Sequence, residues 1–204
     1  MDKSSLQYGK YYHIYNRGNN KEILFKEPQN FNYFMSLYLK YIHPVADTLA
    51  YCLMPNHIHF VVRIKEEMDI KSFEEVGLFQ ERKTIKIENK KPIPSNQFSH
   101  LFNTYSKAIN KNYNRTGSLF EHPFERRLID NLPYLQRCIA YIHNNPIEGH
   151  LVSRMEDYTW SSFKALKSEL STHLNRTHVM SIFEDKDYFL LYHGSKIDEF
   201  KTLD

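Results

Sequence analysis

The stretch TLAYCLMPNHIHFVVRI, residues 48–64, decides the fold expected for this chain. It contains two runs rich in apolar and β-branched residues, at 48–53 and 57–64, with the tripeptide Met-Pro-Asn between them. Two strands joined by so short a connection pair with each other as an antiparallel hairpin. We therefore expect an antiparallel sheet built around this hairpin.

Strand and helix patterns alternate on both sides of the hairpin. Residues 11–15 form a β-rich run that ends at a turn signal, and apolar residues recur at helical spacing from 28 to 43. Downstream, residues 96–113 repeat the helical spacing, and residues 124–129 have the composition of a strand. These patterns predict a strand and a helix before the hairpin, and a helix and a strand after it.

A third helix is expected after the last strand. Asn131 can cap this helix, Pro133 suits its first turn, and Pro146 is expected to end it. The resulting order is β-α-β-β-α-β followed by a helix. This order predicts an α+β fold, with a ferredoxin-like split β-α-β antiparallel sheet, helices on one face, and a C-terminal helix and tail.

The chain is expected to form a single domain over residues 1–165. Residues 65–95 are interpreted as an insertion or mobile loop, because residues 65–91 mix seven acidic and seven basic side chains with little periodicity. Residues 166–204 are interpreted as a C-terminal extension with an acidic end. That end could fold over a basic surface or be a solvated helix.

Composition excludes several classes of protein. Hydrophobic residues make up 41% of the 204 residues and charged residues 25%, which is typical of a globular protein. No apolar run approaches the ~20 residues that span a bilayer, and two cysteines are too few for a disulfide scaffold. We therefore expect a cytoplasmic protein without membrane partners. No Walker loop or dinucleotide-binding glycine motif is present, so no nucleotide cofactor is expected.

The formal net charge of +3 is unevenly distributed. Residues 184–204 hold six acidic residues and three lysines, so basic residues are in excess over the rest of the chain. Fifteen Tyr, fourteen Phe and eleven His accompany that excess. Basic side chains bind phosphates and aromatic rings stack on unpaired bases, so this composition suits binding of single-stranded nucleic acid. Aromatic residues also fill the core of any small domain.

The second strand of the hairpin carries the pattern His57-Ile58-His59. Side chains alternate along a strand, so His57 and His59 project from one face, about 6–7 Å apart, while Ile58 and Phe60 project from the other. Two imidazoles at this spacing can bind one divalent ion. The alternative is a pair of surface histidines on a half-buried strand.

Tyr141 and Asn145 lie four residues apart near the end of the third helix, which places them on one helix face. One interpretation is a tyrosine that covers the core and an asparagine that caps the helix. The other is a tyrosine nucleophile with an amide oxygen offered to the same metal ion.

Taken together, these motifs resemble the single-tyrosine HUH transposases, in particular the REP-associated tyrosine transposases. In this family two histidines flank a hydrophobic residue, as in 57–59 here. The similarity covers roughly residues 8–165, with the motifs in the expected order. The stretches that carry it are MPNHIHF at 54–60, YIHNNP at 141–146, YYHIYNRG at 11–18, GSLFE at 117–121 and WSS at 160–162. This sequence departs from the family's pattern in two places. It has Glu148 where relatives often have a basic residue nearby, and its insertion at 65–91 is longer than in compact relatives.

The resemblance implies a metal-dependent single-stranded DNA endonuclease and strand transferase that acts on hairpin-bearing DNA. Tyr141 would be the catalytic nucleophile, forming a 5′-phosphotyrosine link and freeing a 3′-OH. His57, His59 and, by motif position, Asn145 would bind Mg²⁺ or Mn²⁺. The ion matters because a phenol, with a pKa of about 10, is a weak nucleophile at neutral pH. Both monomers and homodimers occur among relatives, so both assemblies are open here.

Basic residues outside these motifs are candidate DNA contacts or parts of a solvated face. Among the histidines, His13 is assigned a structural or DNA-proximal role rather than metal binding, and His143 is not expected to be the general base. The DNA-binding candidates are Arg17, Lys107, Lys111, Arg115, Arg126 and Arg127.

Two other classes of function fit parts of the pattern. The alternative is a domesticated, non-cleaving protein that binds structured DNA. The retention of His57, His59, Tyr141 and Asn145 together argues against it, because a pure binder need not retain all four. An unrelated His-x-His metal protein of the cupin type is disfavoured, because that fold is all-β.

Overall fold

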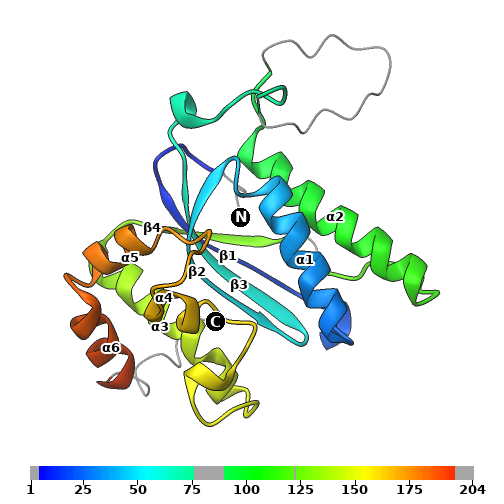
Figure 1. Ribbon diagram of the computed structural model, residues 1–204. Coiled ribbons are helices and arrows are strands. Elements are labelled where there is room, and N and C mark those ends of the chain that lie inside the picture. The colour runs from blue at the N-terminus through cyan, green and yellow to red at the C-terminus, as the bar shows by residue number, and fades with distance from the viewer. Residues whose placement is uncertain (1–4, 76–89, 122, 196–204) are drawn as a thin grey trace.

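The computed structural model describes residues 5–75, 90–121 and 123–195. Its centre is a four-stranded antiparallel sheet in the order β2-β3-β1-β4 (Figure 1). The strands are β1 (Tyr11–Arg17), β2 (Ala46–Met54), β3 (His57–Ile64) and β4 (Glu125–Ile129). The hairpin expected from residues 48–64 is therefore β2 and β3, and the split β-α-β topology is confirmed.

Two helices cover one face of this sheet. They are α1 (Pro28–Tyr41) and α2 (Pro94–Asn112), which pack against each other (Figure 1). Their apolar stripes meet the strand residues that point to this side. The resulting core has aromatic side chains at its centre, including Phe34, Phe60, Phe98 and Tyr105, all fully buried.

The helix α3 (Leu132–Glu148) covers the opposite face, so the sheet lies between two helical layers rather than having helices on one face only. The expectation of helices on one face holds for α1 and α2, and the C-terminal helix takes the other side. It does so because a second set of apolar strand residues, including Leu49, Cys52 and Val61, points there and has to be covered. We call this side the α3 face.

The described helices that follow residue 165 belong to the same layer as α3. They include α5 (Arg176–Ile182) and α6 (Lys186–Ser195), which follow the short α4 (Phe163–Lys167). The side chains of Val179, Phe183 and Phe189 are fully buried in the α3 face core. Three single-turn 3-10 helices complete the described elements: η1 (Asn19–Lys21), η2 (Glu67–Asp69) and η3 (Met155–Asp157).

Two parts of the sequence interpretation fall partly outside the described residues. These are the loop at 65–95, of which 76–89 are not described, and the acidic end, of which 196–204 are not described. Within the described ranges, no helix combines the length and apolar character needed to cross a membrane. Both cysteines, Cys52 and Cys138, are buried free thiols, as expected.

Pro146 does not end α3, contrary to expectation. The helix runs through it to Glu148. A proline lacks only its own N–H, and in the last turn of a helix this removes a single hydrogen bond. The following backbone still closes the turn, because Gly149 N donates to the Asn145 carbonyl at 2.8 Å. At the other end, Asn131 caps α3 as predicted, accepting a hydrogen bond from Tyr134 N at 2.9 Å.

A buried chain of polar side chains joins α3 to α6 and to the sheet. His143 Nδ1 lies 2.8 Å from His193 Nε2, and His143 Nε2 lies 2.7 Å from Ser162 Oγ. Ser162 Oγ in turn accepts a hydrogen bond from Tyr51 N on β2. His143 thus points away from the His57 and His59 pair, in keeping with the prediction that it is not a general base.

Because two histidines are buried in this row of polar side chains, we predict that the stability of the protein depends on pH. Burial lowers the pKa of His193 to about 4, so the folded protein keeps it neutral while the unfolded chain takes up a proton near pH 6.5. The free energy of unfolding therefore falls as the pH drops from about 6.5 to 4, by up to about 1.4 kcal/mol per pH unit for this one histidine. Urea unfolding at several pH values should show a shallower dependence for His193→Gln than for the wild type. The exposed His100, replaced as His100→Gln, is the matched control, and an unchanged slope in His193→Gln would contradict the assignment.

Candidate functional site

The His57 and His59 side chains point to the α3 face. Their neighbours Ile58 and Phe60 are buried in the core on the other side, as strand alternation requires. The strand β1 pairs with β3 so that Tyr15 lies opposite His59 and Arg17 lies opposite His57. A cleft of about 370 Å³ opens at this end of the sheet. Its lining residues are Tyr15, Asn16, Arg17, His57, His59, Glu121, Pro123 and Glu125.

His57 is held between two asparagines. Its Nδ1 lies 2.7 Å from Asn56 Oδ1, and its Nε2 lies 3.3 Å from Asn145 Oδ1. Asn145 comes from α3, where its Nδ2 donates to the Tyr141 carbonyl at 2.9 Å, and this bond turns its Oδ1 toward His57. Both ring nitrogens of His57 thus face amide oxygens, which only accept hydrogen bonds.

His59 is almost completely buried, with 2% of its surface exposed. Its Nδ1 lies 3.0 Å from Nε2 of His13, and its Nε2 has no hydrogen-bond partner among the described residues. Burial, followed by the neighbouring His13 and His57, holds the pKa of His59 well below its ordinary value. His59 is therefore a neutral imidazole at neutral pH, which is the protonation state that binds metal ions.

The donor set fits a divalent cation. In the described parts of the chain, no three His, Cys, Asp or Glu side chains are placed to hold a metal ion by themselves. The available atoms are instead two imidazole nitrogens and the amide oxygen of Asn145. Adjacent ligands of a six-coordinate ion with bonds of about 2.1 Å lie about 3 Å apart. The 3.3 Å between His57 Nε2 and Asn145 Oδ1 agrees with that spacing.

Tyr141 lies one helical turn before Asn145, beside the two buried histidines. Its ring meets His59 edge-on, with the ring centroids 5.7 Å apart, and His13 at 6.2 Å. Only 2% of Tyr141 is exposed, and it is not one of the residues that line the cleft. Sequence reasoning placed His57, His59, Tyr141 and Asn145 in one site, and the structure brings all four side chains together.

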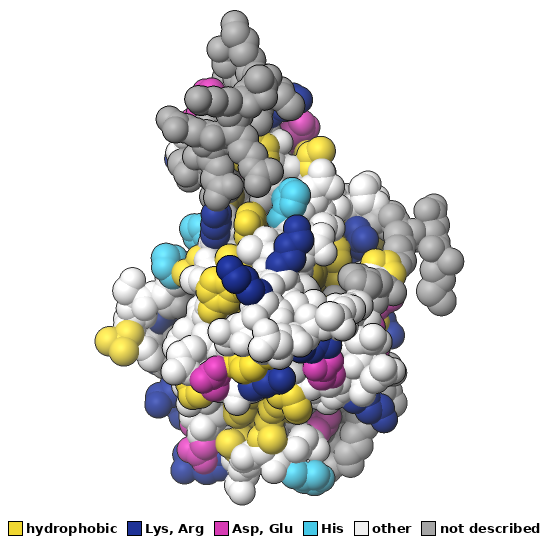
Figure 2. Space-filling view, turned by 90° about the vertical axis from the view of Figure 1, so that its right-hand side faces the viewer, with side chains coloured by type: hydrophobic (Ala, Val, Ile, Leu, Met, Phe, Trp, Pro, Cys, Tyr) yellow, Lys and Arg dark blue, Asp and Glu magenta, His cyan; other side chains and the backbone are white. Residues whose placement is uncertain are grey.

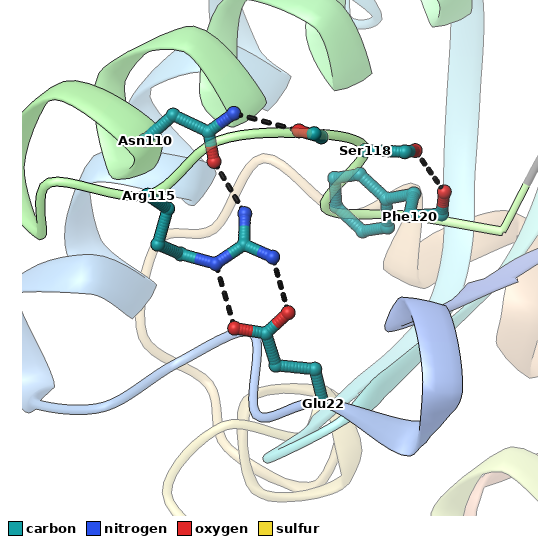
Figure 3. A network of polar contacts seen from close by, with 6 residues as sticks. Glu22, Asn110, Arg115, Ser118 and Phe120 are labelled. Atoms are coloured by element: carbon teal, nitrogen blue, oxygen red, sulfur yellow. Dashed lines mark hydrogen bonds and ion pairs between the residues drawn. The ribbon is translucent and has the colours of Figure 1, made fainter.

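The loop that forms one wall of the cleft is fixed by a polar network (Figure 3). Arg115 pairs with both carboxylate oxygens of Glu22, with its Nε 2.6 Å from Glu22 Oε1, and also donates to Asn110. Asn110 Nδ2 donates to the Gly117 carbonyl at 2.8 Å. This network holds the start of the 117–121 segment, whose Glu121 N donates to the Arg17 carbonyl at 2.8 Å.

The turn after β1 requires its glycine. A Cβ on Gly18 would lie 2.0 Å from the Glu22 carbonyl oxygen, so no other residue fits without moving the backbone. Gly18 N also donates to the Asn56 carbonyl at 2.8 Å, which ties this turn to the β2–β3 connection. The turn signal at 16–20 therefore positions both Arg17 and Asn56 at the cleft.

The six basic candidates are divided between the two sides of the sheet. Arg17 and Arg127 belong to the α3 face: Arg17 lines the cleft, and Arg127 stacks over the ring of Tyr15 with its Cζ 5.6 Å from the ring centroid. Arg126 points to the opposite side, where it lies 4.7 Å from the centroid of the Phe124 ring. Arg115 is engaged by Glu22.

Lys107 and Lys111 lie on the exposed side of α2, across the sheet from His57. Figure 2 views the molecule from the side on which α2 lies, and shows Lys and Arg side chains spread over this face among acidic and uncharged ones. The basic candidates therefore do not form one groove around the cleft.

Sequence reasoning missed several cleft residues. Asn56, Tyr15, Glu121 and Glu125 all lie at the site, and none of them was assigned a role there. Asn56 and Glu121 fall within the motifs at 54–60 and 117–121, so membership in these motifs could have identified both as candidate site residues. Glu125 and Tyr15 face each other across β4 and β1, which only the strand register reveals. His122 lies outside the described residues.

Comparison with known proteins gives two similarities. No protein-family model matches the sequence. A Haemophilus influenzae protein described as a candidate REP-associated tyrosine transposase is 27% identical over 131 residues, which are 63% of this chain and 65% of that protein. The match thus spans slightly less than two thirds of the relative's length. The solved structure of a REP-associated tyrosine transposase bound to a REP hairpin aligns with a TM-score of 0.60 and 13% identity, over 85% of this chain and 88% of that chain.

Since the structural match extends over most of both chains, it settles the architecture. This chain has the fold of a REP-associated tyrosine transposase. The resemblance drawn from the motifs at 57–59 and 141–146 is confirmed, because a sequence relative and a structural relative both carry that description.

We predict that Arg115 serves the fold of the cleft wall. The Arg115 side chain is 14% exposed, so replacing it with Gln removes a partly buried, two-point ion pair and leaves Glu22 without its partner. Arg115→Gln should lower the free energy of unfolding by about 1–2 kcal/mol in urea titrations. The matched control Lys107→Gln on the exposed side of α2 should change it by less than about 0.5 kcal/mol. Equal stability of both variants would show that the ion pair contributes nothing.

Proposed function

We propose that this protein is a metal-dependent single-stranded DNA endonuclease and strand transferase, a transposase-type enzyme that acts on hairpin-bearing DNA. The observation that carries the proposal is the meeting of two histidines from β3 with Asn145 and Tyr141 from α3. A fold alone supports many functions, whereas this combination suits one chemistry. The relative of known structure is bound to a REP hairpin, which supports hairpin DNA as the substrate class.

His57, His59 and Asn145 would hold the divalent ion, through His57 Nε2, His59 Nε2 and Asn145 Oδ1. We assign Mg²⁺ or Mn²⁺, and Mn²⁺ accepts imidazole ligands more readily. When bound, such an ion polarises the scissile phosphate and offsets the negative charge that develops there. Three protein ligands leave positions open for substrate oxygens.

Tyr141 would be the nucleophile. Its hydroxyl oxygen attacks the scissile phosphorus, a new phosphorus–oxygen bond forms, and the bond from phosphorus to the 3′ oxygen breaks. The tyrosine proton leaves to solvent or to the departing oxygen, giving a free 3′-OH and a 5′-phosphotyrosine. Resealing reverses these steps and needs no nucleotide cofactor. Because Tyr141 is 2% exposed, the proposal requires α3 or the cleft wall to move when the strand enters.

Arg17 and Arg127 are the basic candidates that suit a strand running over the α3 face. Arg17 lines the cleft, and the Arg127 guanidinium lies against Tyr15, which itself borders His59. Guanidinium groups bind phosphate oxygens and stack on unpaired bases. A cytoplasmic location suits a DNA substrate and the two unpaired thiols.

We predict that Tyr141→Phe abolishes covalent capture of DNA. Wild-type protein incubated with Mn²⁺ and labelled single strands containing hairpins with varied flanks should give a shifted band on a denaturing gel. EDTA should remove the band, and Tyr141→Phe should never form it, because only the hydroxyl is lost. The matched control is Tyr134→Phe, the other tyrosine of α3, which should retain the adduct.

Two outcomes would contradict this assignment. An adduct that persists in Tyr141→Phe would show that another residue is the nucleophile. Native DNA binding without an adduct on any hairpin would favour the alternative, a non-cleaving protein that binds structured DNA. Salt-sensitive affinity with no covalent product is the expected behaviour of such a protein.

We predict that the salt dependence of the affinity for single-stranded DNA shows which side of the sheet binds the strand. Arg17→Gln and Arg127→Gln should each weaken binding of single-stranded DNA and reduce the slope of log affinity against log salt by about 0.7–1. Lys107→Gln and Lys111→Gln are matched controls on α2 and should leave the slope unchanged. Fluorescence anisotropy at several salt concentrations measures both. Larger effects from the α2 lysines would place the strand on the other side of the molecule.

A further inference from the structure

His13 lies next to His59 for a reason set by strand register. In the β1–β3 pairing, Tyr15 is opposite His59 and His13 is opposite Val61, so His13 is the diagonal neighbour of His59 on the α3 face. Both imidazoles are buried, with 1% of His13 and 2% of His59 exposed. The contact between His13 Nε2 and His59 Nδ1, at 3.0 Å, therefore lies away from water.

Only one of these two nitrogens can carry the shared proton. If His13 donates, His59 has its own proton on Nε2, and that nitrogen then has no lone pair to offer to a metal ion. If His59 donates through Nδ1–H, its Nε2 instead carries a lone pair. The second arrangement is the one able to bind a metal ion.

His57 shows the same arrangement with a different partner. Its Nδ1 faces Asn56 Oδ1 at 2.7 Å, so an acceptor is in place for an Nδ1 proton when Nε2 binds a metal ion. Each histidine of the pair thus has an acceptor on Nδ1 and directs Nε2 away from that acceptor. Asn56 is the acceptor for His57, and His13 takes the corresponding place for His59.

Two tyrosines hold the His13–His59 pair in position. The Tyr15 ring centroid lies 4.9 Å from that of His13 and 6.0 Å from that of His59. On another side, Tyr141 meets both rings edge-on at 6.2 and 5.7 Å. Packing against these rings restricts rotation of the imidazoles, so the remaining choice for His59 is which nitrogen is protonated.

We propose that His13 is a positioning residue that accepts a hydrogen bond from Nδ1–H of His59 and thereby keeps His59 in the tautomer whose Nε2 binds the metal ion. This inference rests on the proposed function for the identity of the ion. It assigns His13 a role that is separate from metal ligation and from DNA contact. Partners of this kind, which orient a metal-binding histidine, typically affect metal affinity by 10–100-fold.

The first test needs neither metal nor DNA. Nitrogen-15 NMR of the histidine rings in the metal-free protein at pH 7.5 distinguishes a protonated from a lone-pair nitrogen at each ring position. Wild-type protein should show a protonated Nδ1 and a lone pair on Nε2 for His59. His13→Gln, whose amide oxygen can replace Nε2 as the acceptor, should keep this state, and His13→Leu should lose it. A wild-type His59 protonated on Nε2 would overturn the proposal without any variant being needed.

The second test measures affinity for Mn²⁺ alone, from the electron paramagnetic resonance signal of the free ion. His13→Leu should bind Mn²⁺ 10–100-fold more weakly than the wild type, and His13→Gln should recover to within a few-fold. His100→Leu, an exposed histidine on α2, is the matched control. Circular dichroism and thermal unfolding check that each variant is folded.

The outcomes separate this inference from the proposed function. Unchanged Mn²⁺ affinity in folded His13→Leu, with loss in His59→Ala, would overturn the positioning role and leave the proposed function intact. Weakened affinity in His13→Leu, together with no covalent DNA product from the wild type, would support the positioning role and overturn the proposed function. A wild type that binds no Mn²⁺ would overturn the inference and the metal part of the proposed function together.

Discussion

The antiparallel pairing of β1 with β3 is the interaction on which the rest of the structure depends. It places Tyr15 opposite His59 and Arg17 opposite His57, and it brings His13 within hydrogen-bond distance of His59. The same pairing separates the two cores, with Ile14 on the side of α1 and α2. A slip of one residue would turn every side chain of β1 to the other face. The register of this pairing therefore determines both which β1 residues reach the candidate site and which are buried in the core.

The position of α3 is the second requirement of the site. Asn131 fixes where the helix begins, and a continuous apolar surface packs it against β2. Near the other end, His143 bonds to Ser162 and His193, two residues away from both Tyr141 and Asn145. The tyrosine and the amide are thus carried by the part of α3 that the buried polar chain holds against the sheet. The C-terminal segment supports the site through packing and that chain.

The cleft is lined by both positive and negative side chains. Arg17 lines it together with two carboxylates, Glu121 and Glu125, and the other basic candidates lie outside it. Charges of both signs therefore border the cleft, and they do not produce a strongly positive field. The surface over α2, with its exposed lysines, is separated from the cleft by the sheet itself.

The sequence by itself determined the order of the elements, the β2–β3 hairpin, the shared direction of His57 and His59, and the shared helix face of Tyr141 and Asn145. These features follow from periods of two and 3.6 residues, which are local properties of strands and helices. Only the tertiary structure decided that α3 covers the second face, that Arg115 is engaged by Glu22, that Tyr141 is buried, and that His13 bonds to His59. These features depend on strand register and on packing between residues far apart in the chain, and a single sequence does not specify either.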